Sequence, residues 1–129
     1  MATKKIILCD TNIFIDYFHE DDHVSKELDY LAFDRLAMSV ISVAESYFGM
    51  RKRERTKTRE LVRKFNLCHV DKEISRLFIQ YMLGYHDHGI SIPDALIAAT
   101  AVSNKMELFT HNREDFDFIE GLTLYNPRY

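Results

Sequence analysis

The 129-residue sequence contains only two cysteines, two prolines and four glycines, and it has no long hydrophobic run. Without a Pro/Gly-rich linker or an internal repeat, the chain is expected to form one domain over residues 1–129. The longest apolar stretch, residues 95–102, is about half as long as a membrane-spanning helix. The apolar run at residues 6–9 is too short for a signal peptide. We therefore expect a soluble cytoplasmic protein without membrane association.

The chain also lacks a net positive charge, since its formal net charge is −3 at pH 7. This charge gives no overall attraction to nucleic acid, so any phosphate-binding surface must be local. Residues 51–64 are the exception, with eight Lys or Arg residues against two Glu. Two interpretations stay open: a solvated helical face, or a surface that contacts RNA phosphates. The first basic residues of this stretch are the candidates for such contacts, namely Arg51, Lys52, Arg53 and Arg55.

Apolar periodicity predicts alternating strands and helices along the whole chain. The expected strands are residues 5–9, 36–40, 67–70, 107–109 and 122–125. The expected helices are residues 11–20, 24–32, 42–52, 54–65, 72–85 and 93–104, with a helical turn near residue 115. This alternation indicates a parallel sheet with helices on both faces. In such sheets the functional site lies beyond the carboxyl ends of the strands.

Four acidic residues lie at or near that predicted edge: Asp10, Glu45, Asp94 and Asp115. Two carboxylates about 5 Å apart repel each other by about 3 kcal/mol at an effective dielectric constant of about 20. Four carboxylates that converge therefore need a cation. Oxygen ligands without a His or Cys cluster favour Mg²⁺ or Mn²⁺. Such a metal can activate water and stabilise the leaving oxygen of a phosphodiester.

The same acids also fit a structural role at helix N-termini, where carboxylates cap the helix and interact favourably with its dipole. Asp10 can cap the helix that starts at Thr11. Three further pairs have the spacing of a capping box: Ser42 with Glu45, Ser91 with Asp94, and Asn112 with Asp115. Both roles are compatible, because a position in the first turn can aim a carboxylate at the sheet edge.

Four motifs occur in order along the chain: Asp10-Thr11-Asn12, Ser39-x-x-Ser42-x-x-Glu45, PDALIAA at residues 93–99, and Thr110-x-Asn112-x-x-Asp115-Phe116. Together they resemble the PIN-domain nucleases and, within them, the VapC toxins of bacterial and archaeal toxin–antitoxin pairs. The resemblance extends from Ile6 to Leu124.

This resemblance implies a three-layer α/β/α fold with a five-stranded parallel sheet, and an endoribonuclease that depends on Mg²⁺ or Mn²⁺. It assigns metal binding and water activation to the four acids, with Asn12, Thr110 and Asn112 as supporting residues. Asp117 could share the role of Asp115, although the Asn-x-x-Asp-Phe frame favours Asp115. We interpret His111 as an exposed neighbour of this site.

The resemblance also implies partners: an RNA substrate, a VapB-type antitoxin and a second copy of the chain in a homodimer. It adds antitoxin binding to the interpretations of the basic stretch. The family's strand order separates Cys9 from Cys68 by about two strand spacings, or about 9.6 Å. Because this is too far for a disulfide, both thiols should be free.

Two alternative functions come from other classes. A PIN fold that binds RNA or protein without cutting it would be expected to have lost some of its acids, and all four are present. A phosphatase with Asp10 as nucleophile would need a second Asp two residues later, where this chain has Asn12.

Overall fold

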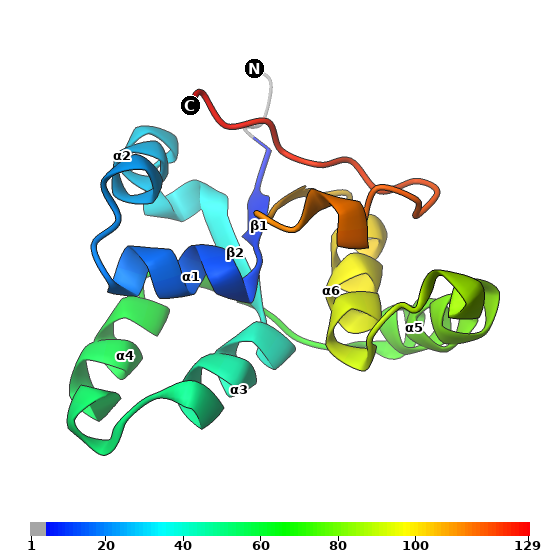
Figure 1. Cartoon of the computed structure of the whole chain (residues 1–129), viewed down its shortest axis with the longest axis horizontal. Helices are drawn as coiled ribbons and strands as arrows, with labels where there is room; N and C mark the ends of the chain where they lie inside the picture. Colours follow the sequence, from blue (N-terminus) through cyan, green and yellow to red (C-terminus); the bar gives the residue numbers. More distant parts are fainter. Residues whose placement is uncertain (1–4) are drawn as a thin grey trace.

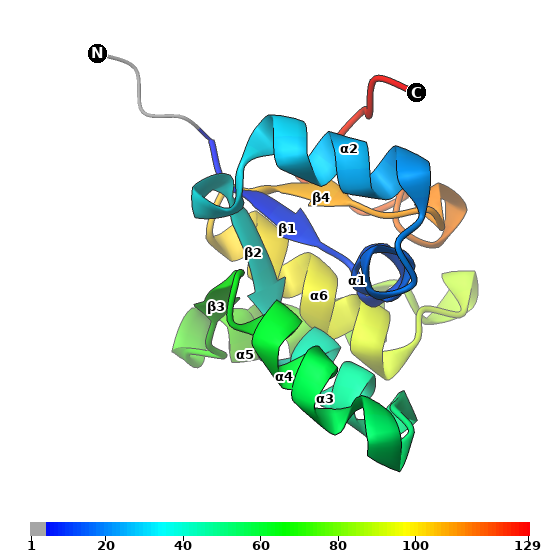
Figure 2. The ribbon, with the colours of Figure 1, turned by 90° about the vertical axis from the view of Figure 1, so that its left-hand side faces the viewer.

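A parallel sheet forms the centre of the computed structural model, which describes residues 5–129. Its strands are β1 (Ile7–Cys9), β2 (Leu36–Ser39), β3 (Asn66–Cys68) and β4 (Glu107–Phe109), in the order β3-β2-β1-β4. Figure 2 shows β1 between β2 and β4. The fifth strand expected at residues 122–125 is reduced to one parallel bridge between Leu124 and Leu108. The predicted α/β class is confirmed, with four strands among the described residues.

Helices cover both faces of the sheet, as Figure 1 shows. The α-helices are α1 (Thr11–Phe18), α2 (Asp22–Leu31), α3 (Val40–Gly49), α4 (Arg55–Val62), α5 (Lys72–Gly84) and α6 (Ile92–Ser103). The described residues also form four short 3₁₀ turns: η1 (Phe33–Arg35) before β2, η2 (Lys52–Glu54) between α3 and α4, η3 (His86–His88) between α5 and α6, and η4 (Arg113–Asp115) after β4.

Alternation along β1 divides the core into two parts. Ile7 and Cys9 pack with the buried side chains of α1 and α2, whereas Leu8 packs with those of α5 and α6. This is the period-two alternation of a strand that is buried on both faces. The result is the expected three-layer arrangement, with the functional edge left open at the carboxyl ends of the strands.

Helix starts agree with the sequence at two sites and differ at two. Asp10 caps α1 by accepting a bond from the Thr11 amide at 2.8 Å. Ser91 caps α6 by accepting a bond from the Asp94 amide at 3.2 Å. The expected capping box of Ser42 and Glu45 is wrong, because Ser39 is the residue that caps α3. The chain passes from β2 into α3 without a loop, and this starts the helix two residues early. Asn112 precedes η4 without a capping bond from its side chain.

Other element boundaries shift for similar local reasons. Helix α2 begins at Asp22 because the Asp21 carboxylate accepts a bond from the Val24 amide at 3.0 Å. The helix expected at residues 54–65 is shortened to α4, and its first residue, Glu54, belongs to η2. Strand β3 begins one residue before its expected range and ends two residues before the expected end.

The two thiols of the chain are free, as expected. Strand β2 separates β1, which carries Cys9, from β3, which carries Cys68. Within residues 5–129, no helix has the length and apolar character needed to cross a membrane.

Candidate active site

Asp10 occupies the centre of the open edge, directly after the central strand β1. Its amide donates a hydrogen bond of 2.9 Å to the Phe109 carbonyl, which continues the pairing of β1 with β4. Its carboxylate accepts one bond from the Thr11 amide and one from the Thr110 hydroxyl, both at 2.8 Å. The side chain is nearly buried, at 5% exposure. A carboxylate held in this way has a fixed direction.

The predicted supporting residues surround Asp10. The Asn12 amide nitrogen lies 3.4 Å from both the Asp10 carboxylate and the Thr110 hydroxyl. The Thr110 hydroxyl also accepts a bond of 3.1 Å from the Asn112 amide. The Asn112 side chain has no part in this network, so only its backbone supports Thr110.

His111 lies in the same loop and is partly exposed, as expected. Its amide donates to the Asn12 side-chain oxygen at 3.3 Å. Its ring nitrogen Nε2 lies 2.8 Å from the Asp16 carboxylate. His111 therefore ties the loop after β4 to α1.

Glu45 reaches the site from α3, and its contact reveals a residue that the sequence did not assign. The Thr11 hydroxyl donates a bond of 2.7 Å to the Glu45 carboxylate. Thr11 thus joins α1 to α3 and fixes Glu45 beside Asp10. The only signal for this role in the sequence is the position of Thr11 next to Asp10, because nothing local pairs it with a residue 34 positions away.

Charge couples the four predicted acids, although they come from four different segments. Burial raises the pKa of Asp10, bonds from Thr110 and Thr11 act in the opposite direction, and the charges of Glu45 and Asp115 raise it further. The pKa of Asp94 is raised from 3.8 to about 6. Burial is the largest cause of this rise, and the charge of Asp10 is the second. Asp115 and Glu45 make further contributions to the pKa of Asp94. The charges of Glu45 and Asp115 thus act on both Asp10 and Asp94, as expected for carboxylates that lie near one another.

Asp115 belongs to this charge cluster, and the neighbouring Asp117 does not contribute to it. Asp115 is the last residue of η4 and is exposed. Its charge raises the pKa of both Asp10 and Asp94, whereas Asp117 is not among the main causes of either shift. This difference favours Asp115 over Asp117 as the fourth acid.

The four carboxylates lie at the same edge of the sheet but are not arranged as a preformed metal-binding site. No three His, Cys, Asp or Glu side chains within residues 5–129 are grouped as a metal-binding cluster. Glu45 instead accepts its bond from Thr11, and Asp10 accepts bonds on both oxygens. The donors at this edge are nonetheless all oxygen atoms, which fit a hard divalent cation such as Mg²⁺ or Mn²⁺.

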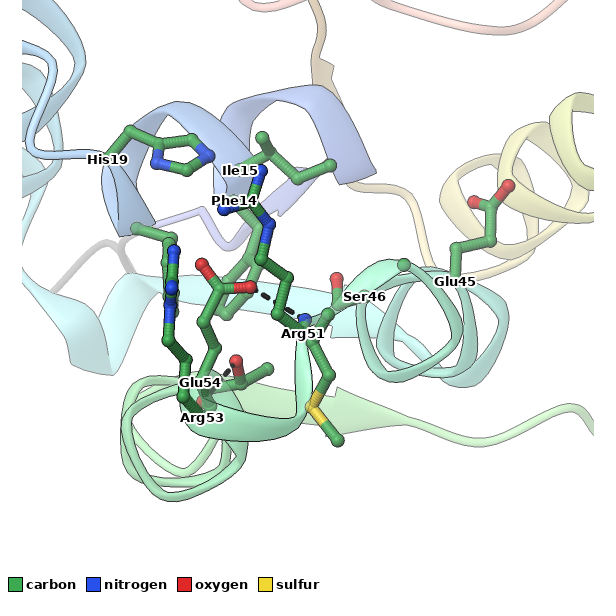
Figure 3. A pocket seen from close by; sticks show the side chains of 12 residues that line it. Phe14, Ile15, His19, Glu45, Ser46, Arg51, Arg53 and Glu54 are labelled. Atoms are coloured by element: carbon green, nitrogen blue, oxygen red, sulfur yellow. Dashed lines mark hydrogen bonds between the residues drawn. The ribbon is translucent and has the colours of Figure 1, made fainter.

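A groove of about 520 Å³ runs from this edge between α1, α3, η2 and α4. Its walls combine apolar side chains of α1 with charged residues, and Glu45 lies at one end. Figure 3 shows Arg51, Arg53 and Glu54 grouped on the side of His19, with Glu45 set apart from them on α3. Lys52 and Arg55 are exposed but do not line the groove. The groove therefore connects Glu45 to two of the four predicted basic contacts, Arg51 and Arg53.

This combination of fold and acidic edge has a clear counterpart among known families. The PIN domain family model matches residues 7–121, and the chain belongs to the PIN domain family. The sequence-based identification of a PIN domain is therefore confirmed.

The similar solved structures narrow the resemblance further. A chain of a toxin–antitoxin complex from Klebsiella pneumoniae is 30% identical, with a TM-score of 0.77 and coverage of 91% of this chain and 95% of that one. VapBC2 from Rickettsia felis bound to promoter DNA is 25% identical, with a TM-score of 0.83 and coverage of 94% and 98%. VapBC-1 from nontypeable Haemophilus influenzae is 26% identical, with a TM-score of 0.78 and coverage of 94% and 97%. A search of curated proteins gave no match. The predicted resemblance to VapC toxins is thus supported by structure.

Proposed function

We propose that this protein is a VapC-type toxin that cleaves RNA with the help of a divalent metal and is neutralised by an antitoxin. One observation carries the proposal: at the carboxyl edge of a PIN fold, Glu45 and Asp115 raise the pKa of both Asp10 and Asp94, although the four acids come from four separate segments. A structural cap needs no such convergence, since each helix start could be satisfied alone.

The four acids are the groups that would hold Mg²⁺ or Mn²⁺. When bound, such a metal would lower the pKa of a water molecule and stabilise the negative charge that develops on the phosphodiester. Asp10 supplies a fixed, nearly buried carboxylate, because Thr11 and Thr110 hold both of its oxygens. Thr11 holds Glu45 beside it. Asn12 and the Asn112 backbone keep Thr110 in place.

RNA would approach along the basic side of the groove. Arg51 and Arg53 line it, and their charge is local in a chain whose net charge is −3. Phosphate contacts of this kind attract RNA without reading its sequence. Lys52 and Arg55 are exposed nearby and can extend the same contact.

The same groove suits the arm of an antitoxin. Phe14, Ile15 and Phe18 give it an apolar wall, and the two arginines give it charge. Several similar solved structures are toxin–antitoxin complexes, and we propose a VapB-type protein as the partner here. An antitoxin seated in the groove would block RNA and also approach Glu45. These partners imply a cytoplasmic location.

A homodimer is the second assembly that we propose. Apolar side chains lie exposed on one side of α5, where Ile79 and Leu83 are 67% and 83% exposed. Phe48 on α3 is 82% exposed. Side chains of this size usually become buried when they belong to an interface.

A matched pair of substitutions tests the nuclease proposal. Asp115→Asn should abolish cleavage of a mixed RNA panel in Mn²⁺, whereas Asp117→Asn, two residues away, should cleave as well as the wild type. Each change removes one exposed carboxylate from the same turn, so they differ in their place in the cluster. Equal loss of cleavage in both variants, or loss only in Asp117→Asn, would show that Asp115 is not the fourth acid of the site.

The alternative is a silent PIN-fold module that binds RNA or protein without cutting it. Titration of the wild type with Mn²⁺ in a calorimeter separates the two functions. The nuclease proposal requires Mn²⁺ binding that weakens in Asp10→Asn, and a protein that binds no Mn²⁺ would support the silent module.

A further inference from the structure

Of the four acids, Asp115 is carried by the shortest element of secondary structure. Asp10 extends a central strand, while Glu45 and Asp94 belong to helices of ten and twelve residues. Asp115 ends the three-residue turn η4, which has no side-chain capping bond. Phe116 anchors the turn on one side, because its ring is buried in the core at 1% exposure. The other side of the turn needs a second anchor if the Asp115 carboxylate is to stay in place.

Arg113, the first residue of η4, supplies that anchor through the C-terminal segment, which we define as residues 125–128. Its Nη1 donates to the Tyr125 carbonyl at 3.0 Å, and its Nη2 donates to the Asn126 side-chain oxygen at 3.1 Å. A planar guanidinium that donates to two acceptors has a defined direction, which the ammonium group of lysine lacks. Both terminal nitrogens of Arg113 therefore point to the C-terminal segment.

The C-terminal segment is itself firmly attached to the rest of the fold. The Tyr125 amide donates to the Leu108 carbonyl of β4 at 2.8 Å. Glu27 of α2, only 2% exposed, accepts bonds from the Tyr125 hydroxyl and from the backbone and side chain of Arg128. A buried carboxylate with all these partners is costly to detach, because separation would leave its charge unpaired.

From these contacts we infer that Arg113 is a positioning residue for Asp115, tying η4 to the C-terminal segment that Glu27 fastens to α2. This inference rests on the proposed function, since it concerns the placement of one of the proposed metal-binding acids. Arg113 does not serve as an RNA contact in this account, because its terminal nitrogens are engaged by Tyr125 and Asn126.

The first readout is independent of activity. The amides of Asp115 and Asp117 donate within the turn to the Asn112 and Arg113 carbonyls, at 3.0 and 2.9 Å. Their hydrogen exchange, measured by NMR without metal, should accelerate about tenfold in Arg113→Ala through local opening of the turn. Arg76→Ala is the matched control, since Arg76 pairs with Glu73 on the distant, exposed face of α5. This control should leave both amides unchanged.

The second readout links the turn to the site. Arg113→Ala should weaken Mn²⁺ binding about tenfold and lower kcat with little change in KM, as expected when a supporting group is lost. Arg113→Lys should recover part of both, because it keeps one donor. Asn126→Ala removes a single bond and should give a smaller effect in the same direction, and it also serves if Arg113→Ala does not fold.

The outcomes separate the two proposals. Wild-type exchange rates in both Arg113→Ala and Asn126→Ala would overturn the inference, whatever the activity. A rise in KM with kcat unchanged would also overturn it, because it would make Arg113 an RNA contact. If the wild type neither binds Mn²⁺ nor cuts RNA, the proposed function fails, and the inference about Asp115 placement in that site fails with it. Faster exchange with normal wild-type activity and weaker Mn²⁺ binding in the variant supports both.

Discussion

Asp94→Asn should make the metal-free protein more stable at neutral pH while it abolishes RNA cleavage. Burial and the charge of Asp10 raise the pKa of Asp94 from 3.8 to about 6. The folded protein therefore holds a proton that the unfolded chain releases in this range, and stability falls as pH rises from about 4 to about 6. Above that range the ionised carboxylate destabilises the fold, and Asn removes this effect.

The size of the gain follows from the same pKa. A rise from 3.8 to about 6 corresponds to an upper limit of about 3 kcal/mol, at about 1.36 kcal/mol for each pKa unit. Because Asp94 is only partly buried, solvent screening reduces this to about 1–2 kcal/mol. Asn also loses a favourable interaction with the helix dipole, worth about 0.3–1 kcal/mol. The helix cap stays intact, since Ser91 accepts its bond from the backbone of Asp94. A net gain of about 1 kcal/mol remains.

Urea unfolding in the absence of divalent metal, at pH 7.5 and at pH 4, measures this gain. We expect Asp94→Asn to exceed the wild type at pH 7.5 and to approach it at pH 4, where Asp94 is protonated in the folded state. Asp117→Asn is the control and should show no such pH-dependent gain, because Asp117 is not among the main causes of the raised pKa of Asp94. The ionised Asp94 does not destabilise the fold if Asp94→Asn is less stable than the wild type at pH 7.5. The same follows if the difference in unfolding free energy is equal at both pH values.

Three further changes test other parts of the structure. Thr11→Val removes the bond to Glu45 and should lower kcat about 10- to 100-fold, with the melting temperature within a few degrees of wild type. Lys105→Gly should add about 0.5–1 kcal/mol of stability in urea unfolding, because Lys105 follows α6 with a φ of 55°. Although burial alone would raise the pKa of Glu27, bonds from Tyr125 and Arg128 hold that pKa below its ordinary value. Its stabilisation is therefore present at neutral pH and lost as pH falls through the folded pKa, so Glu27→Gln should cost about 1–3 kcal/mol at pH 7 and less at pH 3.

Much of the site could be predicted because it depends on local order along the chain. Asp10 and Thr110 each follow a strand directly, and parallel strands end at the same edge, so their proximity follows from the alternation of strands and helices. Ser91 and Asp94 form a helix start that the sequence shows without help from the rest of the fold. To predict the positions of these residues, only the hydrophobic periodicity and the order of the strands and helices are needed.

Other features depend on contacts between distant residues, which local patterns do not contain. The Thr11 hydroxyl bonds to Glu45 across 34 positions, a pairing that the expected capping box of Ser42 and Glu45 did not indicate. The last expected strand pairs with β4 at one bridge only. Beyond it, Tyr125 and Arg128 are directed to Glu27 on α2 by hydrogen bonds across about a hundred residues. Residues 122–125 have a strand-like sequence, but their tertiary contacts limit them to one bridge instead of a full strand.

Metal-dependent RNA cleavage at the acidic edge is tested by incubating a mixed RNA panel with purified wild type and with Asp10→Asn, in Mn²⁺ and in excess EDTA. Asp10→Asn keeps the size of the side chain and an oxygen acceptor for Thr110, but it removes the charge at the centre of the cluster. We expect cleavage by the wild type in Mn²⁺ alone, with none in EDTA and none by the folded variant. Cleavage by Asp10→Asn at the wild-type rate, or wild-type cleavage that persists in EDTA, would contradict it.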